Sequence, residues 1–398
     1  MIKIEVSRAM QNKIRKGWPW VFDYQIVQQS GRGVAGDLGV VYDSQNKFLA
    51  IGLYDPDSPL RLSILQSRKP TSIDAAFFRR QLQTARERRL PLLEQETNGC
   101  RWIHGEGDGF PGLVLDGYAD TGVLKIYSAA WFPHMETLRS LIEEIFKFKR
   151  CVLRLSRNLQ DRESLSKYDF IEGQMLFGPA VQGAVLFKEN GLVFECDPVR
   201  GQKTGFFLDQ RDNRARVKQL AKGKSVLNVF SYSGAFSVYA FSGDCRSVLE
   251  IDLNRFALDA SRRNCLHNFD ESILKAKGLE QMEGDAYEAL SELQAQKRTF
   301  DLVILDPPAF ARSKSQAPKA LAAYSRLSQL GCAVTAPGGV LIAASCSKPV
   351  GGDEFFQAVL NGAEGRVTAE LERTGHALDH PAPFAECEYL KAIYLKLS

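Results

Sequence analysis

The sequence lacks the features that mark zinc proteins, membrane proteins and secreted disulfide proteins. No two of its eight cysteines stand two residues apart, the spacing that zinc sites use, so no metal centre is expected. No run of 18 apolar residues occurs, which argues against a membrane helix. Since there is also no signal peptide and the cysteines are dispersed, the sequence predicts a cytoplasmic protein with reduced thiols and no membrane contact.

The chain also lacks a strong charge of one sign. Its formal net charge is +4 over 398 residues, but residues 1–100 hold 15 Lys and Arg against 10 Asp and Glu, so the basic surplus is N-terminal. A basic surplus of this kind suggests a face that binds a polyanion, although it is also compatible with an ordinary solvated surface. At 44% hydrophobic and 25% charged residues, the chain is typical of a globular protein with two or three domains.

The hydrophobic pattern divides the chain into three parts. Residues 1–69 read as short strands, with a hairpin around Ser-Gln-Asn-Lys in GVVYDSQNKFLAIGLYD, and predict a small all-β module. Residues 70–187 begin with a helix in SIDAAFFRRQLQTARERRL and continue as a mixed α+β unit. In residues 188–398, apolar strands alternate with helices, which predicts an α/β domain whose mainly parallel sheet is covered on both faces.

Polar residues follow several strands of this third part. The segment NVFSYSGAFS at 228–237 joins a strand to a helix, as nucleotide sites in open α/β sheets do, although a plain tight turn would look the same. Asp252 ends the next strand, where an acid can bind ribose hydroxyls. Asp285 precedes a helix, and it can meet an adenine amino group or serve only as an N-cap. Because the turn at 228–237 has only Gly234 and lacks G-x-G-x-x-G, a nicotinamide dehydrogenase is disfavoured.

Two further strands end in residues suited to a flat heteroaromatic ring and a nucleophile. Asp306 is followed by two prolines in LDPPAF, and this stiff turn can hydrogen-bond a base. Arg312, Lys314 and Lys319 come next, either facing phosphate or simply lying in an exposed loop. Cys346 stands between two serines at the end of the apolar run GVLIAAS; a free cysteine there either packs like a small hydrophobe or reacts.

The ordered segments NVFSYSG, EIDLN, EGDAYEAL, LDPPAF and SCS resemble class I S-adenosylmethionine (SAM)-dependent methyltransferases. Among these, the chain is similar to bacterial large-subunit ribosomal RNA cytosine-C5 methyltransferases with an N-terminal PUA domain. KGWPWVFDYQIV and AIGLYDPDSPLRLSIL resemble the PUA module, GEGDGFPGLVLDGY the middle domain, and DHPAPFAECEYLKAIYL the C-terminal hairpin. The resemblance implies a β-barrel PUA domain at 1–69, an α+β middle domain at 70–187 and a Rossmann-like catalytic domain at 188–398.

The resemblance also implies roles for particular residues. Cys346 would be the catalytic nucleophile and Asp306 its catalytic partner, while many other RNA cytosine-C5 enzymes have a second cysteine where this chain has Ala309. RNA would be the partner, and a homodimer is suggested. The residues implied to bind SAM are Phe206, Gln210, Asn228, Phe230, Ser231, Gly234, Asp252, Asp285 and Asp306.

The chemistry expected of such an enzyme explains the thiol, because cytosine C5 becomes nucleophilic enough to accept a methyl group only after a thiolate adds to C6. Two alternatives stay open. One is an RNA methyltransferase that acts on a ring nitrogen, for example of guanine, without a thiol. The other is an RNA-binding assembly factor that keeps the fold but does not catalyse.

Overall fold

The computed structural model describes residues 1–160 and 168–398, and it divides into two compact units. The first unit consists of residues 1–187, 196–206 and 378–383, and the second of residues 188–195, 207–377 and 384–398. The chain therefore passes between the units more than once.

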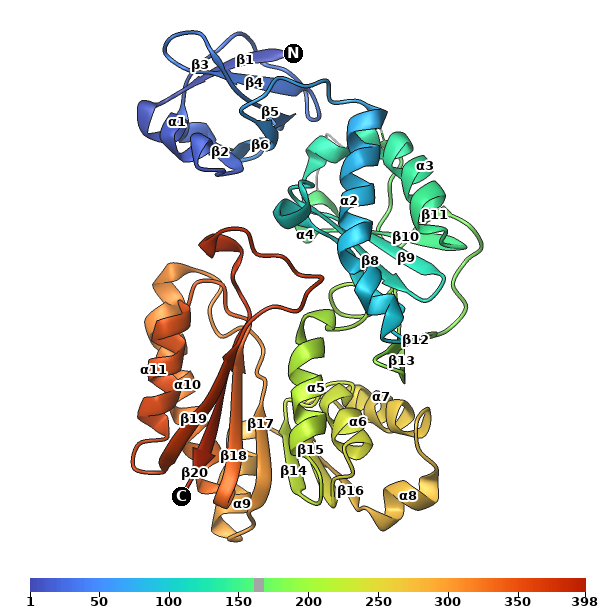
Figure 1. Cartoon of the computed structure of the whole chain (residues 1–398), viewed down its shortest axis with the longest axis vertical. Helices are drawn as coiled ribbons and strands as arrows, with labels where there is room; N and C mark the ends of the chain where they lie inside the picture. The colour runs from blue at the N-terminus through green and yellow to red at the C-terminus, as the bar shows by residue number, and fades with distance from the viewer. Residues whose placement is uncertain (161–167) are drawn as a thin grey trace. The chain divides into compact units, whose positions relative to one another are not determined.

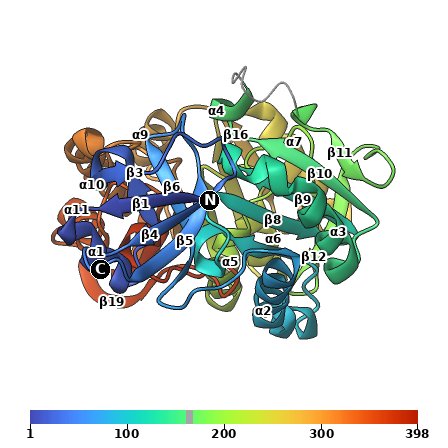
Figure 2. The same cartoon turned by 90° about the horizontal axis from the view of Figure 1, so that it is seen from above.

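The first unit begins with a six-stranded sheet in the order β2-β6-β5-β4-β1-β3, and Figure 2 labels all of these strands except β2. Its inward side chains form an apolar cluster that includes Ile4, Val21 and Leu62. The predicted hairpin is confirmed: β4 and β5 pair antiparallel, and the carboxylate of Asp43 accepts the backbone N–H groups of Gln45 and Lys47 in the turn. The strands are β1 (Ile2–Val6), β2 (Trp20–Phe22), β3 (Ile26–Gln29), β4 (Leu38–Tyr42), β5 (Phe48–Tyr54) and β6 (Leu60–Ser67).

The prediction of an all-β module is wrong in one respect, because helix α1 (Arg8–Arg15) follows the first strand. Ser7 caps it by accepting the N–H of Met10, and Met10 and Ile14 bury its inner face. One turn separates these two apolar residues, so an amphipathic signal was present in the sequence but spanned only eight residues.

A second sheet in the first unit has the order β11-β10-β9-β8-β7 and packs against helices α2 (Ala75–Glu94) and α3 (Met135–Phe146). Residues Ala129–His134 form a 3-10 helix before α3. The strands are β7 (Gly99–His104), β8 (Leu113–Tyr118), β9 (Thr121–Ile126), β10 (Arg150–Leu155) and β11 (Met175–Phe177). A short helix, α4 (Arg157–Gln160), follows β10.

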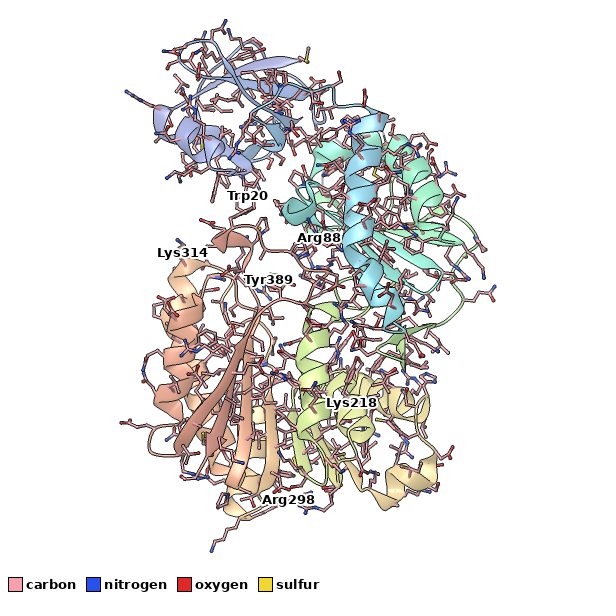
Figure 3. The ribbon with its side chains drawn as sticks, viewed as in Figure 1. Trp20, Arg88, Lys218, Arg298, Lys314 and Tyr389 are labelled. Atoms are coloured by element: carbon pink, nitrogen blue, oxygen red, sulfur yellow. The ribbon has the colours of Figure 1, made fainter. Side chains whose placement is uncertain are left out.

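The arginines of α2 do not form one solvated face. Arg89 is fully buried, and its guanidinium binds both carboxylate oxygens of Asp108 at 2.8 and 2.6 Å. Arg79 pairs with Glu144, and Arg88, labelled in Figure 3, pairs with Asp108 while 38% of its side chain stays exposed. Arg89 therefore has a structural role, because a buried guanidinium is stable only when it is paired.

The second unit is built on a seven-stranded sheet in the order β16-β15-β14-β17-β18-β20-β19 (Figure 1). The first five of these strands run parallel and β20 is antiparallel to both neighbours, so the predicted mainly parallel sheet is confirmed. Its strands are β14 (Ser225–Val229), β15 (Ser247–Asp252), β16 (Leu279–Glu283), β17 (Phe300–Leu305), β18 (Thr335–Ser345), β19 (Val367–Thr374) and β20 (Lys391–Leu397). A two-stranded sheet of β12 (Val185–Glu189) and β13 (Leu192–Cys196) precedes them.

Helices cover both faces of this sheet, as the alternating pattern predicts. One face is covered by α5 (Arg211–Leu220), α6 (Ala235–Ser242) and α7 (Arg255–Leu266), and the other by α9 (Ala286–Ala295), α10 (Ala317–Ala333) and α11 (Gly352–Gly362) (Figure 1). The short α8 (Glu271–Ala276) leads into β16. None of the helices in the described ranges combines the length and apolar character needed to cross a bilayer.

Candidate active site

The sheet order of the second unit reverses at β14. From β14 the chain adds β15 and β16 on one side and then returns to add β17 and β18 on the other. Open α/β sheets bind ligands at such a switch point, beyond the carboxyl ends of the strands. The predicted site residues that directly end or follow these five parallel strands are Asn228, Phe230, Ser231, Gly234, Asp252, Asp285, Asp306 and Cys346.

The turn between β14 and α6 is tightly wound. Phe230, Tyr232 and Gly234 have φ values of 60°, 47° and 72°, and side chains are uncommon in this region. At Gly234 a Cβ atom would lie 1.7 Å from the Ser261 hydroxyl oxygen and 2.8 Å from a carboxylate oxygen of Glu250. Only glycine fits there, so the single glycine in this motif is required by both backbone and space.

Asp252 joins this turn to the next strand. One of its carboxylate oxygens accepts the Tyr232 N–H at 2.8 Å and the other accepts the Asn254 N–H at 2.9 Å. These bonds fix the carboxylate at the end of β15. Each oxygen keeps further acceptor capacity, as ribose hydroxyls require.

Asp285 and Phe206 lie in different settings. Asp285 is exposed and caps α9 by accepting the N–H groups of Tyr287 and Glu288, so its structural role is present whatever else it binds. Phe206 belongs to the first unit, where its buried ring meets that of Phe187 edge-on at 5.0 Å. The other predicted site residues belong to the second unit.

Two buried polar atoms test whether this edge fits a ligand such as SAM. Neither Oδ1 of Asn228 nor Oγ of Ser231 has a hydrogen-bond partner within residues 1–160 and 168–398. The Asn228 amide is oriented by a 2.9 Å bond from its nitrogen to the Ser237 hydroxyl. Buried acceptors are normally satisfied, and SAM carries ammonium, hydroxyl and amino donors. The residues therefore fit the group.

Glu250 packs against the turn between β14 and α6 and was missed by sequence reasoning. Its carboxylate is fully buried and accepts bonds from the Ser261 hydroxyl at 2.5 Å and the Gln281 amide at 2.8 Å. Burial raises its pKa. Its position two residues before Asp252 within a strand gave no signal of this role.

Asp306 is held by a relay of amides. Gln210 donates to one Asp306 oxygen at 2.9 Å and accepts from Asn213 at 2.5 Å. Asn213 in turn accepts the hydroxyls of Thr374 and Tyr394. The predicted site residues Gln210 and Asp306 are thus brought together, and their geometry is fixed by strands β19 and β20.

Aromatic contacts hold the segment before α5. Tyr389, labelled in Figure 3, donates its hydroxyl to Asp209 at 2.9 Å and packs on the His376 ring. The His376 ring nitrogen accepts the N–H groups of Tyr389 and Leu390. The segment before β20 and the segment carrying Gln210 are therefore tied to each other.

A buried ion pair completes this support. The Arg214 guanidinium binds both carboxylate oxygens of Glu189 at 2.7 and 2.6 Å, and both side chains are fully buried. Tyr239 donates to the same carboxylate at 3.0 Å, and Arg214 also binds the Phe207 carbonyl. The pair thus anchors α5, which begins next to Gln210.

Cys346 differs from most of the cysteines in its exposure. It is partly exposed directly after β18, whereas six of the eight cysteines are buried. Burial raises the pKa of Cys151 and of Cys245 to about 12, which makes these thiols inert. Of the eight, only Cys346 and Cys387 are partly accessible.

The two serines around Cys346 are tied to Tyr324, which the sequence did not reveal. Ser345 donates to the Tyr324 hydroxyl at 2.8 Å, and that hydroxyl lies 2.7 Å from the Ser347 hydroxyl. Both serines are fully buried. They therefore hold the backbone on either side of the thiol.

The same cluster reaches the turn after Asp306. The Ala311 N–H donates to the Ser347 hydroxyl at 3.3 Å, and the rings of Phe310 and Tyr324 lie 4.8 Å apart. Ala309, in the place of the second cysteine of other enzymes, is exposed. The Asp-Pro-Pro and Ser-Cys-Ser segments are thus joined by buried contacts at the ends of β17 and β18.

Lys391 is the third residue of the site that sequence reasoning missed. It begins β20 opposite Ser345, is 6% exposed, and donates to the carbonyls of Ser347 and Val350 at 2.8 and 2.6 Å. Lys348, two residues after the thiol, is exposed. The sequence separates Lys391 from Cys346, so only the sheet pairing reveals that they are close.

Comparisons with known proteins agree with this geometry. A family model described as S-adenosylmethionine-dependent methyltransferase matches residues 171–388, and one described as PUA-like domain matches residues 4–66. A Deinococcus radiodurans protein named Ribosomal RNA large subunit methyltransferase is 43% identical, covering 100% of this chain and 97% of its own length. An Alteromonas mediterranea protein named Ribosomal RNA large subunit methyltransferase I is 34% identical, covering 100% and 99%.

The fold has counterparts among solved structures. A Streptococcus mutans protein described as a SAM-dependent methyltransferase has a TM-score of 0.82 at 22% identity, with full coverage of both chains. A methyltransferase complexed with SAH has a TM-score of 0.84, also at 22% identity and full coverage. At this identity, the likeness shows the fold.

Fold and site together define a class I methyltransferase that uses S-adenosylmethionine. Its catalytic sheet is preceded by a PUA-like domain. The chain belongs to the SAM-dependent methyltransferase family, in the same group as the full-length relatives above.

Proposed function

We propose that this enzyme transfers a methyl group from SAM to C5 of a cytosine in large-subunit ribosomal RNA, with Cys346 as the nucleophile. The names of the relatives support ribosomal RNA as the substrate. The observation that carries the cytosine-C5 chemistry is a partly exposed thiol held beside the Asp-Pro-Pro turn, at the end of the strand next to it.

The residues that would hold SAM follow the strand ends. Asn228, Ser231 and Gly234 would line the first turn, Asp252 would bind the ribose and Asp285 the adenine. Gln210, Phe230 and Asp306 lie on the same unit and would complete the site, while Phe206 comes from the segment just before it. When bound, SAM supplies an electrophilic methyl group on a sulfonium.

Cys346 activates the base by forming a bond between Sγ and C6. The electrons of the C5–C6 double bond then move to C5, which takes the methyl group, while the electron pair of the broken methyl–sulfur bond stays on the donor sulfur, leaving a thioether. After a base removes the C5 proton, those C–H electrons restore the double bond, the Sγ–C6 bond breaks, and the thiolate returns.

Asp306 would accept a hydrogen bond from the cytosine amino group and favour protonation at N3 while C6 is attacked. Gln210 fixes one of its oxygens, so the carboxylate is aimed before the base arrives. The target cytosine must leave its stack, because its C6 face is inaccessible within a helix.

Exposed cations in both units support an RNA substrate. Arg312, Lys314 and Lys319 are exposed after the Asp-Pro-Pro turn, and Figure 3 labels Lys314. In the PUA-like domain, basic residues at the end of α1 are exposed, and Lys13 lies over the Trp18 ring. Such cations contact phosphate without reading sequence.

The test incubates the enzyme with SAM and large-subunit rRNA transcripts containing 5-fluorocytidine. Fluorine at C5 blocks the final elimination, so a protein–RNA adduct that survives denaturation is expected. Cys346→Ala should abolish the adduct, whereas the matched control Cys387→Ala, at the other partly exposed cysteine, should keep it.

The outcome separates the candidate functions. Full methyl transfer by Cys346→Ala would refute the thiol mechanism, and nucleoside analysis would then identify a ring nitrogen as the acceptor. If the enzyme binds SAM but methylates no rRNA, either free or in subunits, the proposal that rRNA is the substrate is refuted.

A further inference from the structure

Lys391 is unusual because its ammonium is buried without a carboxylate. Among the residues that the structure describes, no acid lies within ion-pair distance of it, and its two acceptors are the carbonyls of Ser347 and Val350. Burying a charge without an opposite charge is costly. Isolated buried cations of this kind concentrate at functional sites.

The two carbonyls belong to the turn that carries Cys346. Ser347 follows the thiol directly, and its carbonyl also accepts the Val350 N–H at 3.2 Å. The turn therefore closes around the side-chain nitrogen of Lys391. Since Lys391 pairs with Ser345 in the sheet, it contacts the backbone on both sides of the thiol.

The charges of Lys391 and Cys346 interact. Burial lowers the pKa of Lys391 to about 8, while the Cys346 thiolate acts in the opposite direction. At pH 7 an amine of this pKa is protonated in roughly nine of ten molecules. The interaction is mutual, so the ammonium must favour the thiolate form of Cys346 as much as the thiolate favours the ammonium.

The other ionisable groups around the pair do not replace this charge. Tyr324 faces Cys346 from α10, and burial raises its pKa, so it stays neutral. Glu354, on α11, faces Lys391 but is exposed and accepts the Gly351 N–H. Lys348 is exposed to solvent, where its charge is screened.

We propose that Lys391 is the positioning residue of the nucleophile: it holds the 346–350 turn through two carbonyls and supplies the buried positive charge that keeps Cys346 reactive at neutral pH. This inference rests on the proposed role of Cys346. The proposal gives β20 a part in the chemistry, although β20 contributes none of the predicted site residues.

The test measures the rate at which iodoacetamide alkylates Cys346 as a function of pH, with the Cys346 peptide followed by mass spectrometry. In the wild-type enzyme the midpoint should lie below about 8.5, the ordinary thiol value. Lys391→Met should slow alkylation at pH 7 by about tenfold, which corresponds to one pKa unit. Lys391→Gln keeps a hydrogen-bond donor without charge and should slow it similarly.

The matched control is Lys396→Met, at the far end of the same strand, where Lys396 pairs with Val340. It should leave the profile unchanged. In the Lys391 variants, kcat for methyl transfer should fall while the Kd for SAM, measured by calorimetry, stays within about twofold. A fall in kcat with an unchanged Kd for SAM would not result from general loss of structure.

Three results would overturn the proposal. They are a wild-type midpoint at or above the ordinary thiol value, an unchanged profile in a folded Lys391→Met enzyme, and an unchanged profile in Lys391→Gln. The wild-type measurement decides if both variants fail to fold. If the 5-fluorocytidine adduct still forms through Cys346 while the profile is unaffected, only the role of Lys391 fails; if Cys346→Ala keeps full activity, the proposed function fails.

Discussion

Replacing Gly234 with alanine should disrupt the first turn of the proposed SAM site by a calculable amount. The new Cβ would lie 1.7 Å from the Ser261 hydroxyl oxygen, which must therefore move away from Glu250. Holding alanine at φ 72° costs about 1–2 kcal/mol. Leaving a buried Glu250 oxygen without its partner costs about 1–3 kcal/mol more. The free energy of unfolding should fall by about 2–5 kcal/mol.

Two other glycines separate these causes. Gly338 has φ 73° but open space around its Cβ position, and Gly284 has open space without a positive φ. Gly338→Ala should therefore cost only the backbone contribution, about 1–2 kcal/mol, and Gly284→Ala less than about 0.5 kcal/mol.

Urea unfolding of the three variants gives the free energies, and calorimetry gives the Kd for SAM. We expect at least a tenfold weaker affinity in Gly234→Ala, because the turn that carries Ser231 must shift. The reasoning is refuted if Gly234→Ala is no less stable than Gly338→Ala and binds SAM as tightly as the wild type does.

Two further predictions concern buried charges. Glu189→Ala leaves Arg214 buried without its carboxylate and should lower the free energy of unfolding, measured in urea, by about 3–5 kcal/mol. The control Glu372→Ala breaks a surface pair and should lower it by at most about 1 kcal/mol. Equal losses in the two variants would contradict the role of the buried pair. Because burial holds the pKa of Lys391 at about 8 in the folded protein, below its ordinary value of 10.5, the unfolded chain binds more protons between these pH values and stability rises with pH. The free energy of unfolding of the wild type, relative to that of Lys391→Met, should therefore rise by roughly 3 kcal/mol from pH 8 to pH 10.5. A relative stability that does not change with pH would argue against a buried ammonium.

The sequence predicts those parts of the site that depend on local order. Strand-helix alternation predicts the parallel sheet, and polar residues directly after apolar strands predict which side chains meet at its edge. Asp252, Asp306 and Cys346 were identifiable for this reason, since the carboxyl ends of parallel strands share one edge. The resemblance to a family added their expected roles.

Other parts depend on packing between distant segments, which no local pattern reports. Tyr324 lies in the middle of an ordinary helix, and Lys391 lies beside a thiol that is far from it in the chain. Glu250 reads as one more residue of a strand. Their roles become visible only through the hydrogen bonds that tie Tyr324 to Ser345, Lys391 to Ser347 and Glu250 to Ser261.

Local pattern also failed where two forces competed. Arg89 stands among several arginines in α2, yet it is buried because Asp108 compensates its charge. The helix α1 was missed because eight residues carry few periodic signals, even though Ser7 caps it.

The position of β20 has a consequence for how the enzyme matures during synthesis. This strand is the last in the chain but lies inside the sheet, between β18 and β19. Cys346 therefore leaves the ribosome well before Lys391 can join it, and the nascent chain carries its thiol without the buried charge. The proposed role of Lys391 therefore predicts that chains cut short before β20 react with iodoacetamide at Cys346 more slowly.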